Sequence, residues 1–364
     1  MRTFSTALFS LLILTSVAAG SSKPVSAGPT IFAKCWEYEV NPNLNVGIAA
    51  DASTVFFLDD ENSLHGVDLE AGSKAWSSEL GGEVVSNLLV LGDSIFIVTN
   101  SQPDPSNPAV RATLRAISRE TGVTDWSVEI PSSPFVWIGS NIGNVIAVGS
   151  GGSVSALTQA GGTLVWTTDL KSRVTAAPFF QESGLEVATN KNEVLNVSGS
   201  EGRVHLDWKS LYLPTAILLD LNGRLVVGDE RGNLIAVSSD GHRLWRFRNG
   251  AQISSASLQG SEYLAASYDN FVYKLSRSGS VKWKRRLSGR VNDGPLLLGD
   301  SAVISIVGTG SVYVLDVKNG KVSNRIEMGD NVTLRLAAAT DGQGFAVAGP
   351  RGISYFRSRK CTAE

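Results

Sequence analysis

The residues best suited to chemistry in this chain of 364 residues are few and far apart in the sequence. The three histidines, His65, His205 and His242, lack the spacing at which side chains share a metal ion. The acidic run Asp59-Asp60-Glu61-Asn62 offers oxygen ligands for Ca²⁺, but without a dedicated loop pattern it is more typical of a solvated turn. No nucleophile motif surrounds any serine. We therefore predict no catalytic residue, no metal site and no bound cofactor.

A repeat of about forty residues organises most of the sequence, and such a period indicates stacked structural units. Each copy contains a strand, a turn with glycine and a second strand that usually carries tryptophan, as in LRAISRETGVTDW and LHGVDLEAGSKAW. In the clearest copies the tryptophan stands four residues after the glycine, at Trp76, Trp126, Trp166, Trp245 and Trp283.

Each repeat resolves into four short strands. The first is rich in small residues, as in Ser172–Phe179, and the second is apolar, as in Val55–Leu58. The third alternates, as in Leu114–Ile117, and the fourth carries the tryptophan. This pattern is typical of closed all-β architectures. We predict an all-β fold, an eight-bladed β-propeller of four-stranded blades, with the small residues lining a narrow central channel.

The two ends of the chain predict how the ring closes. Ala33–Val40 is a fourth strand without its own repeat, with Trp36 in the motif position. The last repeat has a first, second and third strand but lacks a fourth: Val332–Ala338, Phe345–Ala348 and Ile353–Arg357. The N-terminal strand is therefore expected to complete the last blade, which leaves no open half-blade edge.

The tryptophans of the fourth strands are expected to pack as wedges against the neighbouring blade. This blade-packing set is Trp36, Trp76, Trp126, Trp166, Trp208, Trp245 and Trp283, with Asn324 in the eighth position. Two irregularities are expected: Arg203-Val204-His205 lengthens the turn before Trp208, and the proline-containing insertion Ser101–Arg111 forms a surface loop in the second blade.

The N-terminus predicts export. Arg2 precedes the apolar stretch Ala7–Ala19, and small-residue cleavage options end at Ala19 and Ala27. We expect residues 1–27 to be a cleaved signal peptide and residues 28–364 to be a single propeller domain. The mature protein would be periplasmic or secreted, and a position at the periphery of the outer membrane is one option. No cysteine stands at the candidate cleavage sites, so a bacterial lipoprotein anchor is not expected.

The two cysteines, Cys35 and Cys361, fall at the two ends of the closing blade. Cys35 directly precedes Trp36, and Cys361 stands where the other repeats have the turn glycine. Ring closure would bring them into neighbouring strands, and in an exported protein we expect a disulfide between them. The alternative is two unpaired thiols.

Charge is segregated along the chain, although the net charge is only −2, which gives no support to nucleic-acid binding. From Cys35 to Val110 there are twelve acidic residues and one basic residue, whereas from Asp240 to Arg290 there are ten basic and three acidic. The candidate partner-binding residues are Arg243, Arg246, Arg248, Lys282, Lys284, Arg285 and Arg286. Such a surface suits an acidic protein, anionic lipid headgroups or a polyanionic polysaccharide. Alternatively, the charges protect exposed outer strands from edge-to-edge pairing.

The repeat resembles the pyrroloquinoline-quinone-like propeller repeat, in which an aliphatic-Ala-aliphatic-Asp strand precedes Thr-Gly and Trp; LRAISRETGVTDW fits it well. An exported eight-bladed ring of this length is similar to the BamB family. That resemblance implies a non-enzymatic scaffold that binds protein partners in outer-membrane β-barrel assembly. The quinoprotein dehydrogenases of this repeat class typically have a vicinal disulfide, and this sequence contains no Cys-Cys pair. Two alternatives stay open: a quinone- or sugar-active enzyme with its site at the central channel, and a secreted ligand-binding or sensor domain.

Overall fold

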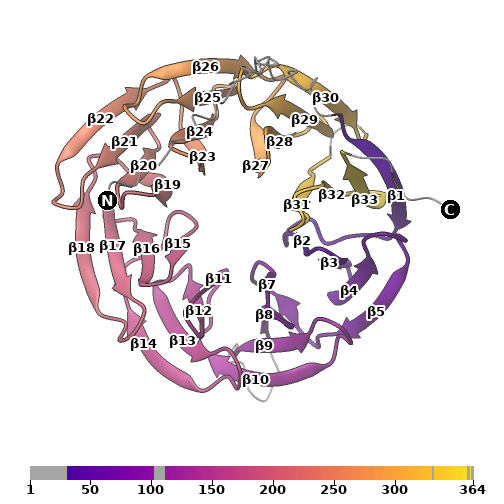
Figure 1. Cartoon of the computed structure of the whole chain (residues 1–364). Coiled ribbons are helices and arrows are strands. Elements are labelled where there is room, and N and C mark those ends of the chain that lie inside the picture. Colours follow the sequence, from indigo (N-terminus) through magenta and orange to yellow (C-terminus); the bar gives the residue numbers. More distant parts are fainter. Residues whose placement is uncertain (1–30, 102–110, 330–331, 359–360, 362–364) are drawn as a thin grey trace, which may run out of the picture.

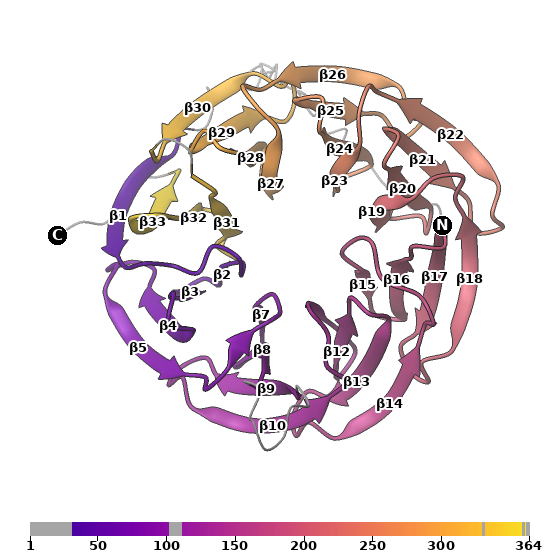
Figure 2. The ribbon, with the colours of Figure 1, turned by 180° about the vertical axis from the view of Figure 1, so that it is seen from behind.

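The structure, a computed structural model, describes residues 31–101, 111–329, 332–358 and 361. The expected signal peptide and most of the insertion Ser101–Arg111 lie outside the described residues. The described residues form eight antiparallel sheets arranged radially around a central axis (Figures 1 and 2). The predicted all-β, eight-bladed propeller is therefore confirmed. Among the residues described, no helix is long and apolar enough to cross a membrane.

Blades 1 to 4 follow in chain order, each running from the centre of the ring to its rim. Blade 1 contains β2 (Ala49–Ala50), β3 (Thr54–Leu58), β4 (Ser63–Asp68) and β5 (Lys74–Glu79). Blade 2 contains β6 (Glu83–Val84), β7 (Leu89–Leu91), β8 (Ser94–Asn100), β9 (Ala112–Ser118) and β10 (Thr124–Ile130). Blade 3 contains β11 (Val136–Asn141), β12 (Asn144–Gly149), β13 (Ser153–Thr158) and β14 (Leu164–Asp169). Blade 4 contains β15 (Phe179–Gln181), β16 (Gly184–Ala188), β17 (Glu193–Ser198) and β18 (Val204–Lys209).

Blades 5 to 8 complete the ring. Blade 5 contains β19 (Pro214–Leu219), β20 (Leu225–Asp229), β21 (Asn233–Val237) and β22 (Arg243–Arg248). Blade 6 contains β23 (Ile253–Gln259), β24 (Glu262–Ser267), β25 (Phe271–Leu275) and β26 (Val281–Arg286). Blade 7 contains β27 (Val291–Leu298), β28 (Ser301–Ile306), β29 (Ser311–Asp316) and β30 (Val322–Glu327). Blade 8 contains β31 (Arg335–Ala338), β32 (Gly344–Gly349), β33 (Gly352–Arg357) and β1 (Ala33–Glu39).

Ring closure occurs by the predicted strand exchange. β1 pairs antiparallel with β33, with Trp36 opposite Tyr355 and Glu39 opposite Gly352. The register shifts between Lys34 and Trp36, which places a bulge at Cys35. Because the fourth strand of blade 8 comes from the other end of the chain, a backbone hydrogen-bond ladder within blade 8 joins the two ends of the described chain.

Blade 2 departs from the predicted four strands because its inner strand is divided into β6 and β7. Between them, the hydroxyl of Ser86 accepts the N–H of Val98 at 2.8 Å, so a side chain replaces a strand-to-strand bond. The same segment turns toward blade 3, where the N–H of Val136 donates to the carbonyl of Val85 at 2.7 Å. The divided strand thus connects two blades.

Blade 4 also differs, because the predicted first strand over Ser172–Phe179 is largely irregular. Val174 makes an isolated bridge with Thr189, and the regular strand β15 begins only at Phe179. Pro178 explains the interruption, since proline has no N–H to give to a ladder.

Small polar residues of the inner strands connect neighbouring blades, which gives these positions a second role beside fitting a narrow channel. In several places a side chain donates to a backbone carbonyl of the next inner strand, for example Thr175 to Pro214 at 2.9 Å, Thr215 to Ile253 at 2.7 Å, Ser255 to Gly294 at 2.7 Å, and Asn292 to Leu334 at 2.7 Å. These bonds satisfy carbonyls on strands that lack a ladder partner on their inner side.

The hydrophobic core lies between blades rather than within them. Phe56 and Leu64 of blade 1, for example, pack in one cluster with Ile95 and Ile97 of blade 2, and all four are fully buried. Each blade therefore depends on both neighbours to cover its two apolar faces.

The disulfide should be a large contributor to stability. Replacing Cys35 and Cys361 by serine opens a loop with a sequence separation of 326 residues. The chain-entropy model then predicts a loss of about 6 kcal/mol in the free energy of unfolding. Urea unfolding monitored by tryptophan fluorescence measures it. Reductant should lower the stability of the parent chain to that of the double variant and leave the variant unchanged; equal stability of parent and variant without reductant would contradict the prediction.

Candidate functional site

The repeated tryptophans form a contact between successive blades. The indole N–H donates to a backbone carbonyl in the third-to-fourth-strand turn of the next blade. The six pairs are Trp36 with Leu69 at 2.7 Å, Trp76 with Arg119 at 3.0 Å, Trp126 with Gln159 at 3.1 Å, Trp166 with Gly199 at 2.9 Å, Trp245 with Arg277 at 2.9 Å, and Trp283 with Val317 at 2.9 Å. These six side chains are engaged in holding blades together.

The turn glycine is part of the same contact. At Gly122, where φ is +73°, an added methyl group would lie 2.5 Å from Cε3 of Trp76. The indole ring therefore covers the glycine directly, and a side chain there would push the ring away. In such a repeat the glycine contacts the indole ring of the preceding blade, and the tryptophan four residues later contacts the following blade. This double contact explains the four-residue spacing in the sequence.

Trp208 departs from this arrangement, and the reason corrects the expected lengthened turn. The turn at Gly202 has the same form as the others, and β18 already begins at Val204. The bulge comes two residues later than usual, between Leu206 and Trp208. Leu206 consequently occupies the usual tryptophan position, and Trp208 packs at the edge of the hydrophobic cluster that blades 4 and 5 share.

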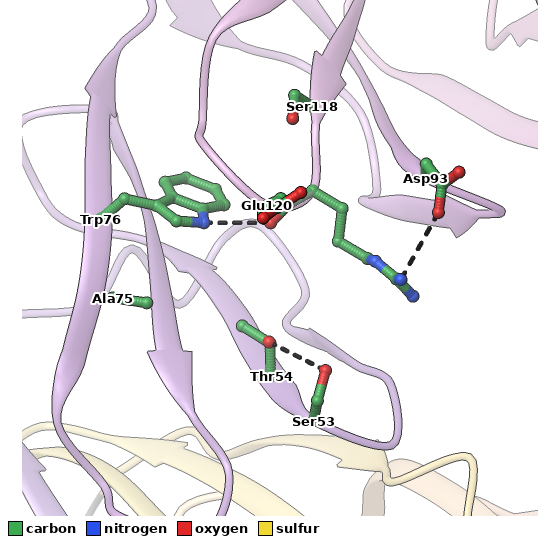
Figure 3. A pocket seen from close by; sticks show the side chains of 8 residues that line it. Ser53, Thr54, Ala75, Trp76, Asp93, Ser118 and Glu120 are labelled. Carbon is green, nitrogen blue, oxygen red and sulfur yellow. Dashed lines mark hydrogen bonds and ion pairs between the residues drawn. The ribbon is translucent and has the colours of Figure 1, made fainter.

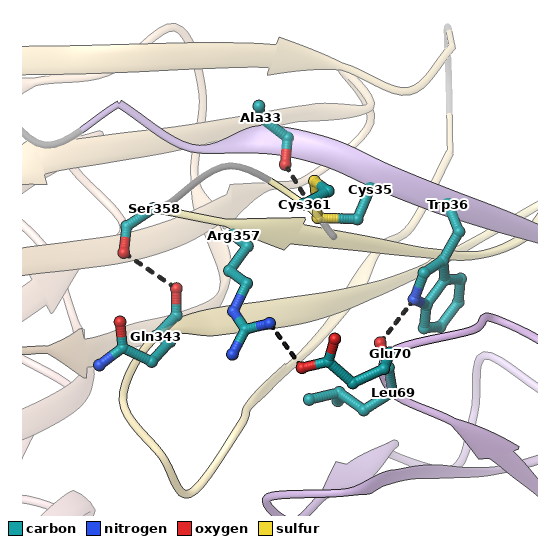
Figure 4. Close-up of a disulfide and its surroundings, with 9 residues drawn as sticks. All are labelled: Ala33, Cys35, Trp36, Leu69, Glu70, Gln343, Arg357, Ser358 and Cys361. Carbon is teal, nitrogen blue, oxygen red and sulfur yellow. Dashed lines mark hydrogen bonds and ion pairs between the residues drawn. A yellow bond between two sulfur atoms is a disulfide. The ribbon is translucent and has the colours of Figure 1, made fainter. Parts of the chain in front are cut away.

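The closing blade shows why Asn324 replaces the eighth tryptophan. Its third-to-fourth-strand turn is interrupted by the chain ends, and Cys361 rather than glycine stands four residues after β33. Cys361 is bonded to Cys35 with a Cα–Cα distance of 5.3 Å (Figure 4). The amide oxygen of Asn324 instead accepts the N–H of Phe32 at 2.7 Å. A small polar side chain thus replaces the indole where glycine is missing.

Three of the sequence-predicted basic residues of blades 5 and 6 have a polar partner among the described residues of the propeller, and four do not. Lys282 forms an ion pair with Glu262, and Arg285 donates through Nε to the carbonyl of Gly320 in blade 7. Arg246 donates to the amide oxygen of Asn233 at 2.8 Å. These contacts occupy three of the predicted residues within the propeller itself.

The other four predicted residues are exposed. The ammonium group of Lys284 lies 5.4 Å from the ring centroid of Phe271. Arg243, Arg248 and Arg286 are exposed and take part in none of the ion pairs found among the described residues. Blades 5 and 6 lie across the ring from the acidic blades 1 and 2 (Figure 1), so the charge segregation of the sequence becomes segregation across the ring.

A pocket of about 370 Å³ lies between blades 1 and 2 and is lined by Trp76, Asp93 and Arg119 among others (Figure 3). The guanidinium of Arg119 contacts Asp51 at 3.0 Å and Asp93 at 3.6 Å. Asp51 also accepts the N–H groups of Ser53 and Thr54, each at 2.7 Å. The charges of this pocket therefore already serve to join two blades.

The histidines lie apart, as the sequence indicates. His65 is nearly buried and contacts Asp59 at 2.7 Å, while Asp59 also accepts the N–H groups of Glu61 and Ser63 in a tight turn. His205 and His242 are exposed in blades 4 and 5. Within the described part of the chain, no group of three or more His, Cys, Asp or Glu side chains is placed to hold a metal ion.

Sequence reasoning missed a buried carboxyl group in blade 4. Glu186 is 1% exposed; its Oε1 accepts the amide of Asn196 at 2.7 Å, and its buried Oε2 has no hydrogen-bond partner among the described residues. Burial, together with the negative charge of Asp207, raises the pKa of Glu186 from 4.5 to about 7, against the opposing effect of Asn196. A glutamate in the middle of an apolar second strand was the available signal.

Three comparisons place the chain among known proteins. The family model described as "Outer membrane protein assembly factor BamB" matches residues 33–141, 111–216 and 216–344. Outer membrane protein assembly factor BamB of Yersinia pestis is 24% identical over 271 residues, which cover 74% of this chain and 60% of that protein. The protein of the same name from Nitrosomonas eutropha is 29% identical over 112 residues, 29% of this chain and 27% of that protein. The matches thus span less than two thirds of these relatives.

Solved structures agree on the fold. BamB from Moraxella catarrhalis superimposes with a TM-score of 0.69 at 14% identity, covering 90% of this chain and 100% of that one. The C-terminal WD40 domain of Sif2 gives 0.75 at 14% identity, with coverages of 92% and 100%. The computationally designed protein Ika8 gives 0.71 at 13% identity, with coverages of 89% and 98%. Such similarity is shared by propellers of different origin.

The glycine–tryptophan contact predicts an unequal effect of two similar substitutions. Gly122→Ala combines backbone strain with overlap against Trp76, whereas Gly143→Ala, at φ +75°, has nothing within 4 Å of the added methyl group. We expect Gly143→Ala to cost about 1 kcal/mol from its left-handed backbone. Gly122→Ala should cost about 1–3 kcal/mol more, from overpacking. Urea unfolding of both variants measures the difference; equal losses would show that the ring does not occupy the glycine.

Glu186 predicts a pH dependence of stability. Between pH 4.5 and about 7 the folded chain holds a proton that the unfolded chain releases, so stability falls as the pH rises through this window. The full effect is up to about 3 kcal/mol. Glu186→Gln should remove this slope and stabilise the protein above pH 7, whereas Glu182→Gln, at an exposed carboxyl of the same blade, should keep it. Urea titrations across the window test this, and an unchanged slope in Glu186→Gln would contradict it.

Proposed function

Because the chain belongs to the family of the outer membrane protein assembly factor BamB, we propose that it acts as a non-enzymatic, protein-binding scaffold of the cell envelope. The observation that carries the proposal is the family match, which extends from the closing strand β1 to the start of β32 in the last blade. Its role would be in outer-membrane β-barrel protein assembly, as the name of its relatives states.

Two features of the ring support a scaffold over the quinone-active alternative. Six of the eight tryptophans are committed to blade-to-blade contacts. The cysteines are 326 residues apart in sequence and join the ends of the ring, so they do not provide a vicinal disulfide. A propeller of this kind offers a rigid surface for partners.

The proposal includes export. Residues 1–27 would be removed as a signal peptide, and the propeller of residues 28–364 would lie in the periplasm, peripheral to the outer membrane. The disulfide between Cys35 and Cys361 supports an oxidising compartment.

The partner-binding surface that we propose is the outer edge of blades 5 and 6. It comprises Arg243 and Arg246 on β22 and Lys284 on β26, all exposed, although Arg246 also donates to Asn233. Cations along an outer rim would attract an acidic partner and orient it before close contact, an effect that salt weakens.

In situ crosslinking of the tagged chain in its native envelope, followed by mass spectrometry, tests the scaffold. Recovery of an outer-membrane assembly protein, decreasing as salt rises, is the expected result. Arg243→Glu, Arg246→Glu and Lys284→Glu combined should lower its yield several-fold. A control variant carries the same charge change elsewhere on the ring and should give the same crosslinking yield as the parent chain. Its substitutions are Lys74→Glu, Lys321→Glu and Arg351→Glu.

Recovery of no protein by the parent chain would reject the scaffold. Equal recovery by both triple variants would retain the scaffold and reject the outer edge of blades 5 and 6 as its binding surface.

A further inference from the structure

At one end of the ring, the same backbone hydrogen bond recurs in successive blades. The first or second residue after each second strand donates its N–H to the linker that enters the blade. In blades 4 to 7 these pairs are Asn190 to Arg173 at 2.9 Å, Glu230 to Leu213 at 3.0 Å, Tyr268 to Gln252 at 2.9 Å, and Val307 to Arg290 at 2.8 Å. The second-to-third-strand turns and the entry linkers therefore lie together, and we call this surface of blades 4 to 7 the turn end.

Six exposed cations gather at the turn end. They are Arg173 and Arg290 in the linkers entering blades 4 and 7, Lys191 and Arg231 in the turns of blades 4 and 5, and Arg248 and Arg286 at the ends of β22 and β26. None of the six belongs to an ion pair found among the described residues. At the opposite end of the ring, by contrast, several cations are paired: Arg119 with Asp51, Arg203 with Glu201, Lys282 with Glu262, and Lys318 with Asp300.

Few carboxylates balance these cations. Glu230 is exposed beside Arg231, and Asp269 is half-buried and accepts the hydroxyl of Tyr273 at 2.6 Å. Lys171 and Lys209 add two cations that are already paired, with Asp169 and Glu193. Asp229 is buried and accepts the N–H groups of Arg231 and Asn233. Even with this carboxylate counted, the turn end keeps a net positive charge that no ion pair among the described residues neutralises.

Apolar side chains are interspersed among the cations. Leu211 is 76% exposed, Val307 48% and Tyr268 37%. The guanidinium of Arg290 lies 5.4 Å from the ring centroid of Tyr268, and that of Arg231 lies 5.8 Å from the ring centroid of Tyr212. Aliphatic and tyrosine side chains beside guanidinium groups match the boundary between phospholipid headgroups and acyl chains, which accepts both at the same depth.

This composition is not a general property of the repeat. In blade 1 the same hydrogen bond joins the N–H of Asp60 to the carbonyl of Asn41 at 2.9 Å, and the next turn residue is Glu61. Glu61 takes the position that Lys191 and Arg231 have in blades 4 and 5. Protection of sheet edges does not explain the four cations in turns and linkers either, because turns and linkers are not strand edges.

We propose that the turn end docks directly on an anionic phospholipid surface, with the six cations on lipid phosphates and Leu211, Tyr268 and Val307 entering the headgroup layer. Each cation held close to an anionic surface strengthens binding roughly fivefold. Because these contacts lie at the surface, salt weakens them over a screening length of about 10 Å.

Vesicle flotation of the purified, full exported chain tests the proposal without any protein partner. The chain should float with vesicles of phosphatidylcholine and phosphatidylglycerol, remain behind with phosphatidylcholine alone, and dissociate as salt rises. Lys191→Glu, Arg231→Glu and Arg290→Glu combined should weaken binding at least tenfold. Leu211→Ser should weaken it several-fold without changing its salt dependence.

The matched control reverses three exposed cations at the opposite end, Lys74→Glu, Arg277→Glu and Lys321→Glu, and should bind nearly as well as the parent. Unfolding midpoints confirm that each variant is folded. Equal loss in both triple variants would indicate only net charge, and no binding of the parent to anionic vesicles would indicate a different occupant such as an acidic protein. Displacement by soluble glycerophosphoglycerol at the same phosphate concentration would indicate a small-anion site. Each of these outcomes overturns the proposal, and none bears on crosslinking to a protein partner.

Discussion

The structure depends on one constraint: no blade can cover its own two apolar faces. The clusters that bury residues such as Phe56 and Ile95 are shared between neighbours, so an incomplete ring would leave two faces open to water. Pairing of β1 with β33 removes these open faces by joining the two ends of the chain within one sheet. The disulfide secures the same join, which explains why the only two cysteines stand there.

The blade-to-blade contact follows from that constraint. A tryptophan gives each blade a large apolar surface and an N–H donor at its rim, and a glycine in the next blade makes room for it. The tryptophan needs the glycine, whereas the glycine can occur without it: Gly241 keeps its left-handed turn at φ +81° with no indole against it. Where the chain ends interrupt the turn and Cys361 replaces glycine, Asn324 replaces tryptophan and bonds to Phe32 instead. Where the bulge moves by two residues, Leu206 takes the rim position and is exposed.

Sequence reasoning predicted the fold, the closing strand and the position of the disulfide because these depend on a repeat that is visible in the residues. It did not predict the divided inner strand of blade 2, since Ser86 replaces a ladder bond through a side-chain contact that no pattern encodes. It also could not separate cations with a polar partner in the propeller from those without one. Arg285 and Arg286 are adjacent in sequence, yet one reaches a carbonyl in blade 7 and the other points to solvent. Lys191 and Arg231 were overlooked because they are single residues in turns, although their equivalent positions in two repeats were an available signal.

A closed ring leaves function to surfaces that do not take part in closure, namely the outer rim and the two ends. The two proposed surfaces use different parts of this remainder: a protein partner at the outer edge of blades 5 and 6, and phospholipid at the turn end of blades 4 to 7. They adjoin at Arg248 and Arg286, the last residues of β22 and β26. A ring resting on lipid through its turn end would therefore hold its outer edge upright beside the membrane, open to the proposed protein partner. The charge asymmetry then sets the orientation of the propeller, since the acidic blades 1 and 2 would be repelled from the same anionic surface.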